Sequence, residues 1–166
     1  TAFEFGAVGK RYLALVRGWP PDDQLIDYPL RRLDDDGVAL GEDTAQSATT
    51  VLRTLRRVEL PIPIDRYPAT RYALVELEPR TGRRHQLRRH LKHIGHPILG
   101  DTSYGKGNHN RLVRERFGAT RMLLHAAGIS LAHPVDGRAL AIEAPLPADF
   151  AAVAAALGLG LSGEPT

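Results

Sequence analysis

The segment from Arg80 to His90 reads RTGRRHQLRRH, and GHPILGD follows it from Gly95 to Asp101. Between Pro79 and Gly100 the chain has six Lys or Arg, four His and no Asp or Glu. Subtracting these six charges from the net charge of +3 leaves −3 for the remaining residues. This concentration of positive charge in one short segment predicts a surface that binds a polyanion such as a nucleic acid.

The same segment predicts a helix over 86–94. Leu87, Leu91 and Ile94 form an apolar stripe at i, i+4 and i+7, and Gly95 ends the pattern. The adjoining face carries the basic residues His85, Arg88, Arg89 and Lys92, so we expect them to stay exposed as one patch. The preceding Thr81-Gly82 would present free backbone N–H groups at the positive end of the helix dipole.

Alternating apolar residues predict strands on both sides of this helix. The strand candidates are Lys10–Arg17, Ser47–Leu60, Thr70–Glu78, Arg121–Leu131 and Ala139–Glu143, and Pro147–Leu157 is a terminal helix candidate. Residues 22–46 are acidic and weakly periodic, which predicts an exposed segment on the surface. Strands outnumber helices and lack regular helical crossovers, so we predict an α+β fold with a mixed or antiparallel sheet. Residues 1–157 would form one domain, and 158–166 a loose tail.

Composition narrows the class of protein. The chain has 166 residues, of which 43% are hydrophobic and 25% charged, as in ordinary globular domains. No apolar run approaches the roughly 20 residues that span a bilayer, so we expect no membrane partner. There is no cysteine, which excludes disulfides and thiolate metal sites and fits the cytoplasm. The only methionine is Met122, so Thr1 is not an unprocessed start, and we expect a preceding segment in the natural protein.

Three other motifs favour ordinary structural roles. The run Gly100–Lys106 resembles a phosphate-binding loop, but Gly107 replaces the Ser or Thr that would hold a metal ion. The histidines at 85, 90, 93 and 96 have neither the spacing nor the partners of a metal shell, so no metal is expected. Asp34-Asp35-Asp36 before Gly37 is typical of a solvated turn.

Several motifs together resemble the RluA-type family of RNA pseudouridine synthases. These motifs occur in the family's order: Lys10–Gly18, Gly82–His90, Pro97–Asp101, Leu124–Ala126 and His133-Pro134. The resemblance covers Lys10 to Phe150. Three stretches further resemble the branch that modifies uridine 65 of tRNA: Val16–Pro20, Asp27–Leu30 and Tyr67–Leu91.

The resemblance implies a fold and an activity. The fold would be a bent mixed, mostly antiparallel sheet flanked by helices, with tRNA crossing a central cleft. The reaction would convert a uridine to pseudouridine by breaking the C–N glycosidic bond, rotating the base and forming a C–C bond. It would use no cofactor and no metal.

The resemblance also assigns roles to particular residues. Tyr12 matches the tyrosine that stacks on the flipped base, and Arg88 the arginine that pairs with the catalytic aspartate. The other basic residues are interpreted as RNA-backbone contacts, namely Arg83, Arg84, Arg89 and Lys92. Without the resemblance, Tyr12 would be an ordinary strand aromatic and Arg88 a phosphate contact.

The chain departs from the family at the catalytic aspartate. No His-Arg-Leu-Asp motif precedes Lys10, and Arg32-Leu33-Asp34 follows it in the wrong order, so the role is not assigned to Asp34. We expect the catalytic aspartate upstream of Thr1, so that residues 1–157 form a catalytic domain without its N-terminal segment. The alternative is a non-catalytic RNA-binding module.

Overall fold

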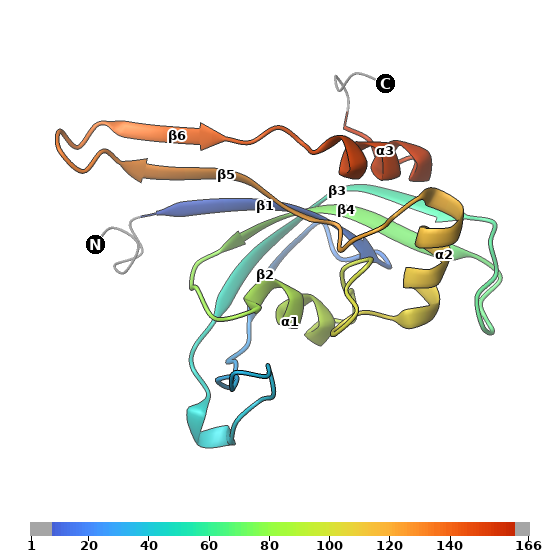
Figure 1. Ribbon diagram of the computed structural model, residues 1–166, viewed down its shortest axis with the longest axis horizontal. Helices are drawn as coiled ribbons and strands as arrows, with labels where there is room; N and C mark the ends of the chain where they lie inside the picture. Colours follow the sequence, from blue (N-terminus) through green and yellow to red (C-terminus); the bar gives the residue numbers. More distant parts are fainter. Residues whose placement is uncertain (1–7, 162–166) are drawn as a thin grey trace.

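The computed structural model describes residues 8–161 and shows one six-stranded sheet with three α-helices (Figure 1). The strands are β1 (Gly9–Arg17), β2 (Asp23–Asp27), β3 (Thr49–Leu60), β4 (Thr70–Pro79), β5 (Leu124–Ala132) and β6 (Ala139–Glu143). The helices are α1 (Gln86–His93), α2 (Gly107–Phe117) and α3 (Ala148–Leu157), and a short 3-10 turn spans Glu42–Thr44. The α+β prediction is confirmed.

The sheet has the order β2-β3-β4-β1-β5-β6, and each pair of neighbouring strands is antiparallel. Of the two predicted alternatives, a mixed or an antiparallel sheet, the strands within residues 8–161 therefore form the antiparallel one. A parallel pair needs a long crossover connection, whereas antiparallel neighbours do not. Register shifts between Arg11 and Tyr12, opposite β5, and between Thr54 and Arg56, opposite β4, locally interrupt the regular pairing.

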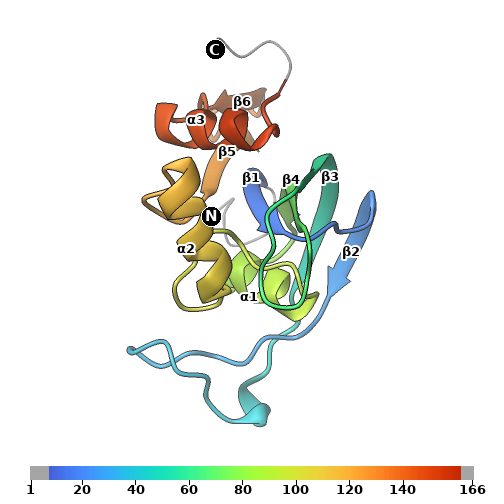
Figure 2. The same cartoon turned by 90° about the vertical axis from the view of Figure 1, so that its right-hand side faces the viewer.

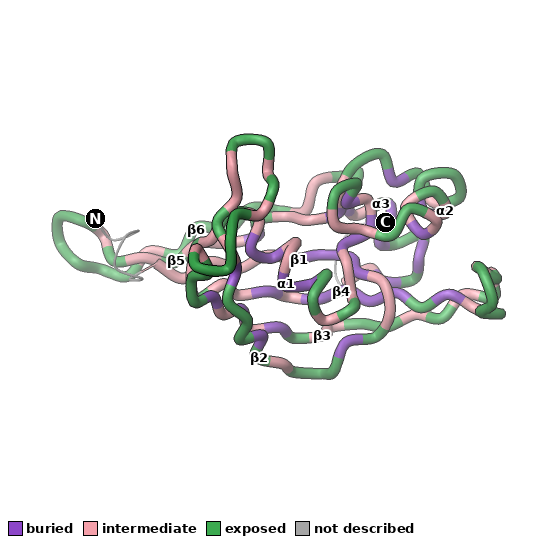
Figure 3. Tube along the Cα trace, turned by 90° about the horizontal axis from the view of Figure 1, so that it is seen from below, coloured by how far each residue is buried: buried purple, intermediate pink, exposed green. Residues whose placement is uncertain are grey.

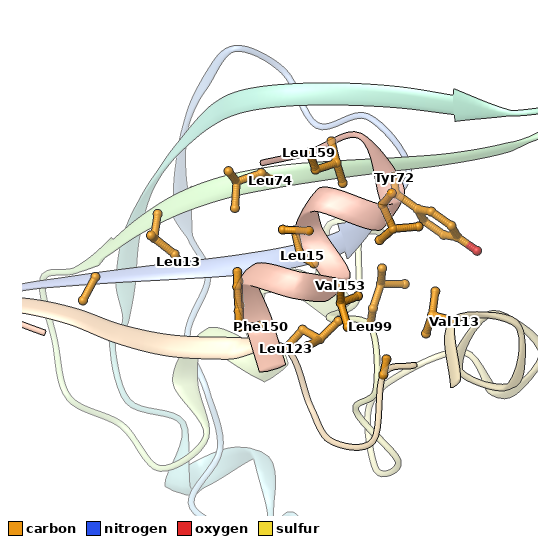
Figure 4. Close-up of a cluster of buried hydrophobic side chains, with 14 residues drawn as sticks. Leu13, Leu15, Tyr72, Leu74, Leu99, Val113, Leu123, Phe150, Val153 and Leu159 are labelled. Carbon is orange, nitrogen blue, oxygen red and sulfur yellow. The ribbon is translucent and has the colours of Figure 1, made fainter. Parts of the chain in front are cut away.

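The core lies on both faces of the central strands, as Figure 3 shows by the buried positions along β1 and β4. On β1, Leu13 and Leu15 join one apolar cluster, and Ala14 and Val16 join the other. Figure 4 shows the first cluster, where Phe150 and Val153 of α3 pack over the sheet. The second cluster contains the stripe residues Leu87 and Leu91 of α1. The sheet therefore separates α1 from α3 (Figure 2), as a strand with two apolar faces requires.

Two elements escaped prediction. The edge strand β2 is mostly exposed, and its Leu25 faces solvent. Helix α2 begins with Gly-Asn-His-Asn and buries only His109 and Val113, so its periodic signal is weak. The expectation of a loose tail is wrong at its first residues, since Leu159 is buried and its N–H donates to the carbonyl of Ala154. Residues 162–166 of the tail lie outside the described residues.

Candidate active site

Tyr12 and Arg88 line the same pocket, whose volume is about 390 Å³. Tyr12 comes from β1 at the register shift, and Arg88 from the first turn of α1. Pro79 at the end of β4 and Leu124 at the start of β5 form further walls. The volume lies within the range of small-ligand sites, so one flipped base is a reasonable occupant.

The Arg88 guanidinium is held by a buried carboxylate. Its Nε lies 2.8 Å from Oδ2 of Asp101 and its Nη2 lies 2.9 Å from Oδ1. Asp101 is only 1% exposed, and its Oδ1 also accepts the backbone N–H groups of Ser103 and Tyr104. Burial by itself raises the pKa of Asp101, but the hydrogen bonds from Arg88 and Tyr104 outweigh it and lower the pKa. Asp101 is therefore ionised at neutral pH.

This pairing gives Arg88 a partner other than the catalytic aspartate that the resemblance implies. A guanidinium has five N–H donors in a planar fork. Within residues 8–161 the structure shows no hydrogen bond from Nη1 of Arg88, which leaves that edge for a second acceptor. Sequence analysis missed Asp101 as a site residue, although it is the first acidic residue after the basic segment.

His85 and Tyr104 complete the surroundings of Arg88. The Arg88 guanidinium lies over the Tyr104 ring, 4.9 Å from its centroid, and the Tyr104 hydroxyl lies 3.1 Å from Nδ1 of His85. His85 has a left-handed backbone with φ of 53° and also lines the pocket. Burial, followed by the positive charge of Arg88, lowers the pKa of His85, so the ring is neutral at pH 7.

A buried polar network fixes α1 on β3. Nε2 of His90 lies 2.9 Å from the carbonyl oxygen of Tyr28, and Nδ1 lies 2.9 Å from the Thr50 hydroxyl. A carbonyl only accepts, so we assign the proton to Nε2, and Nδ1 accepts from Thr50. The Gln86 side-chain amide donates to the same hydroxyl. Burial lowers the pKa of His90, which keeps it neutral and makes it a structural residue rather than part of the exposed basic surface.

Three of the four predicted phosphate contacts bind backbone carbonyls of the 28–48 segment, which we call the excursion. Arg83 donates to Ser47 over 3.0 Å, Arg84 to Asp34 over 2.5 Å and Arg89 to Arg31 over 2.7 Å. The rings of Tyr28 and His93 stack with centroids 3.5 Å apart. The excursion therefore lies against α1 and extends away from the sheet (Figure 2).

The basic charge of α1 nevertheless remains largely uncompensated. A carbonyl oxygen is neutral overall, so these bonds hold the guanidinium groups without cancelling their charge. Lys92 is exposed, and the structure shows no hydrogen bond or ion pair for it among the described residues. Asp34 does not line the pocket, and its side chain accepts the N–H groups of Asp36 and Val38 within a turn.

Two further properties follow from the described range, 8–161. No group of three or more His, Asp or Glu side chains is arranged to hold a metal ion there. None of the helices in that range is long and apolar enough to cross a membrane.

Comparison with known proteins gives consistent matches. The sequence model for RNA pseudouridylate synthase matches residues 1–93. The chain is 49% identical over 147 residues to tRNA pseudouridine synthase C of Salmonella typhimurium, covering 87% of this chain and 56% of that protein. It is also 49% identical over 140 residues to the protein of that name from Vibrio cholerae, covering 82% and 57%. The chain therefore spans about half the length of these curated relatives.

Solved structures agree with the sequence matches. The human RNA pseudouridylate synthase domain containing 4 superposes with a TM-score of 0.69 at 27% identity, covering 95% of this chain and 65% of that one. The human domain containing 1 gives a TM-score of 0.66 at 30% identity, covering 88% and 58%. Since the family's sequence model covers more than half of the residues and the fold agrees, the chain belongs to the RNA pseudouridylate synthase family.

Proposed function

We propose that this chain is part of the catalytic domain of a tRNA pseudouridine synthase that converts one uridine to pseudouridine in the cytoplasm. The resemblance of the chain to one branch of the family implies that this uridine is uridine 65. The observation that carries the proposal is the pocket shared by Tyr12 and Arg88 in a member of this family. Curated relatives that match most of the chain bear the name tRNA pseudouridine synthase C, which supports tRNA as the substrate.

The chemistry of Tyr12 and of Arg88 suits a different role for each in the pocket. Tyr12 offers an aromatic face to a base that has left its stack, and such stacking contributes about 1–3 kcal/mol. Arg88, with two of its nitrogens held by Asp101, presents its remaining edge to an acceptor in the pocket. None of the pocket's lining residues within 8–161 is an Asp or Glu. We propose that the catalytic carboxylate enters the pocket from outside this range and is oriented by Arg88.

RNA backbone binding would rest on the basic face of α1. Lys92 is exposed, and Arg83, Arg84 and Arg89 keep their net charge while holding the excursion. These four residues would give a salt-dependent, sequence-independent contribution to affinity. Choice of the target uridine would come from the pocket and from RNA shape.

The test is pseudouridine formation in a tRNA transcript by the full-length protein, read by mass spectrometry, together with tRNA affinity. We expect Arg88→Gln and Tyr12→Ala each to lower the conversion rate at least 100-fold while changing tRNA affinity by less than tenfold. Arg53→Gln is the matched control, because Arg53 is exposed on β3 and does not line the pocket. Near-normal conversion by Arg88→Gln would remove its assigned role, and tRNA binding without conversion by the native protein would favour a non-catalytic RNA-binding module.

A further inference from the structure

A second pocket, of about 500 Å³, lies at the other end of β1. Arg17 at the end of β1, the 61–69 turn, Thr70 at the start of β4 and His109 of α2 form its walls. No residue lines both this pocket and the candidate active site. Tyr12 and Arg17 are five residues apart on one strand, which places their Cα atoms about 17 Å apart.

Arg17 brings an unmatched positive charge to this second pocket. Within residues 8–161 the structure shows no hydrogen bond or ion pair for its side chain. Arg17 lies opposite Tyr72 in the register of β1 with β4 and lines the pocket together with His109. Burial is the main cause of the shifted pKa values of Tyr72 and His109, and the charge of Arg17 lowers both. The Arg17 backbone is fixed as well, because its carbonyl accepts a 2.8 Å hydrogen bond from Nδ1 of His96.

The nearby carboxylates are occupied by other partners. Glu59 lies 2.9 Å from Nε of Arg71. Asp65 accepts a 2.7 Å hydrogen bond from the side-chain amide of Asn108, which is neutral and leaves the negative charge of Asp65 in place. Neither carboxylate forms an ion pair with Arg17 among the described residues, so the Arg17 guanidinium remains available to an anion in the pocket.

Two further donors belong to residues that line the same pocket, Thr70 and His109. The Thr70 residue is 2% exposed, and its hydroxyl makes no well-formed hydrogen bond, although it lies close enough to Tyr72 to influence the phenol. A buried hydroxyl without a partner is costly unless a ligand or water satisfies it. It is the one such side-chain atom among the described residues.

The third donor is His109, whose Nδ1 lies 2.8 Å from the Tyr72 hydroxyl. Figure 4 shows that hydroxyl pointing out of the apolar cluster. Burial raises the pKa of Tyr72 to about 12, so the phenol keeps its proton and can donate it to Nδ1. Burial, then Arg17, lowers the pKa of His109 to about 4, so the ring is neutral at pH 7 and carries its proton on Nε2.

We propose that this second pocket binds one nucleotide through its phosphate, with Arg17, the Thr70 hydroxyl and Nε2 of His109 as donors. The volume exceeds that of a phosphate alone. One part of the remaining wall is apolar or aromatic, formed by Ile64, Tyr67, Pro68 and Ala69, and the ion pair of Glu59 and Arg71 forms another part. Such a wall suits a base. Resting on the proposed function, the nucleotide belongs to the RNA substrate; a free mononucleotide has the same chemistry.

The test is an NMR titration of the purified protein with uridine 5′-monophosphate, with inorganic phosphate as the second probe. We expect the nucleotide to shift amide signals of 17–18 and 64–71 and to bind more tightly than phosphate. Arg17→Gln should weaken nucleotide binding at least tenfold and Thr70→Val several-fold, while Arg53→Gln, away from the pocket, should leave it unchanged. Thr70→Val keeps the side-chain shape and removes the unpaired hydroxyl, so this variant is expected to fold.

Undiminished nucleotide binding by Arg17→Gln, or no shifts of the amide signals at the pocket, would overturn the proposed nucleotide site. Equal affinity for phosphate and nucleotide would overturn the proposed contact with the base. A tRNA-binding arm identifies the source: weaker tRNA binding by Arg17→Gln supports an RNA nucleotide, and unchanged tRNA binding overturns that assignment in favour of a free nucleotide. Nucleotide binding is measured without any uridine conversion. Its failure is therefore distinct from failure of the proposed activity.

Discussion

Replacing Asp101 by asparagine tests whether a buried ion pair fixes Arg88. Removing one partner of a buried pair costs about 3–5 kcal/mol of stability. Here the cost is smaller, because Arg88 is 18% exposed and water partly solvates the remaining cation. The asparagine also keeps an oxygen for the N–H groups of Ser103 and Tyr104. We therefore expect Asp101→Asn to lower the free energy of unfolding by about 2–3 kcal/mol at pH 7, which is a fall in Tm of roughly 5–10 °C.

The pH dependence separates charge from shape. The folded-state pKa of Asp101 is lowered, so its contribution is complete above the unfolded pKa of about 4 and is lost as the pH falls through the lowered value. Urea unfolding followed by circular dichroism should show a difference between native protein and variant that is constant from pH 7 to 5 and shrinks below pH 4. A variant within about 0.5 kcal/mol of native at pH 7, or a difference that does not change with pH, would refute the reasoning.

The matched control for this experiment is Asp149→Asn. Asp149 makes the same two-bond contact with Arg121, at 2.6 and 3.0 Å, but both side chains are exposed. Exposed pairs are screened and contribute little. We therefore expect a much smaller loss of stability in this variant, and a loss as large as that of Asp101→Asn would show that burial is not the cause.

Two further predictions concern α1. Leu91→Ala should lower the free energy of unfolding by about 2–5 kcal/mol in urea titrations, because Leu91 is fully buried against the sheet. The control Leu25→Ala, on the exposed strand β2, should have little effect. Equal losses of stability in the two variants would contradict the packing of Leu91. Nitrogen NMR of the imidazoles should show His90 as the Nε2–H tautomer at pH 7, with a folded-state pKa below 6.5. The stability that the neutral ring provides is then complete above pH 6.5 and declines as the pH falls. Titration of His90 above pH 6.5 would disprove the buried network.

The central strands and α1 were predictable because their signals are local. Each face of β1 and β4 is apolar, and the stripe of α1 repeats within one short segment. Strand β2 has an exposed, polar pattern because it lies at the sheet edge, and α2 depends on contacts of His109 and Val113 rather than on periodicity. Local patterns cannot report an element whose stability comes from distant partners.

The same contrast between local signals and distant contacts applies to the residues of the candidate site. Tyr12 and Arg88 lie within recognisable motifs, so the sequence predicts them as site residues, and the structure brings both to one pocket. Asp101 was missed because its contact with Arg88 depends on how the chain turns after α1. The sequence predicts a phosphate contact for Arg84 but not its bond to the carbonyl of Asp34, because that partner is 50 residues away in the sequence.

The arginines just before α1 and on it hold the excursion and can still bind RNA, because each guanidinium has more donors than its hydrogen bonds use. Arg89 uses two bonds, to Arg31 and Arg84, out of five N–H groups. Removing Arg84 would therefore change the seating of the excursion as well as the charge. Lys92 makes no such bond to any residue of the described range, so Lys92→Ala tests the charge by itself. Any loss of tRNA affinity common to both variants reports the phosphate contact, and the excess in Arg84→Ala reports the excursion.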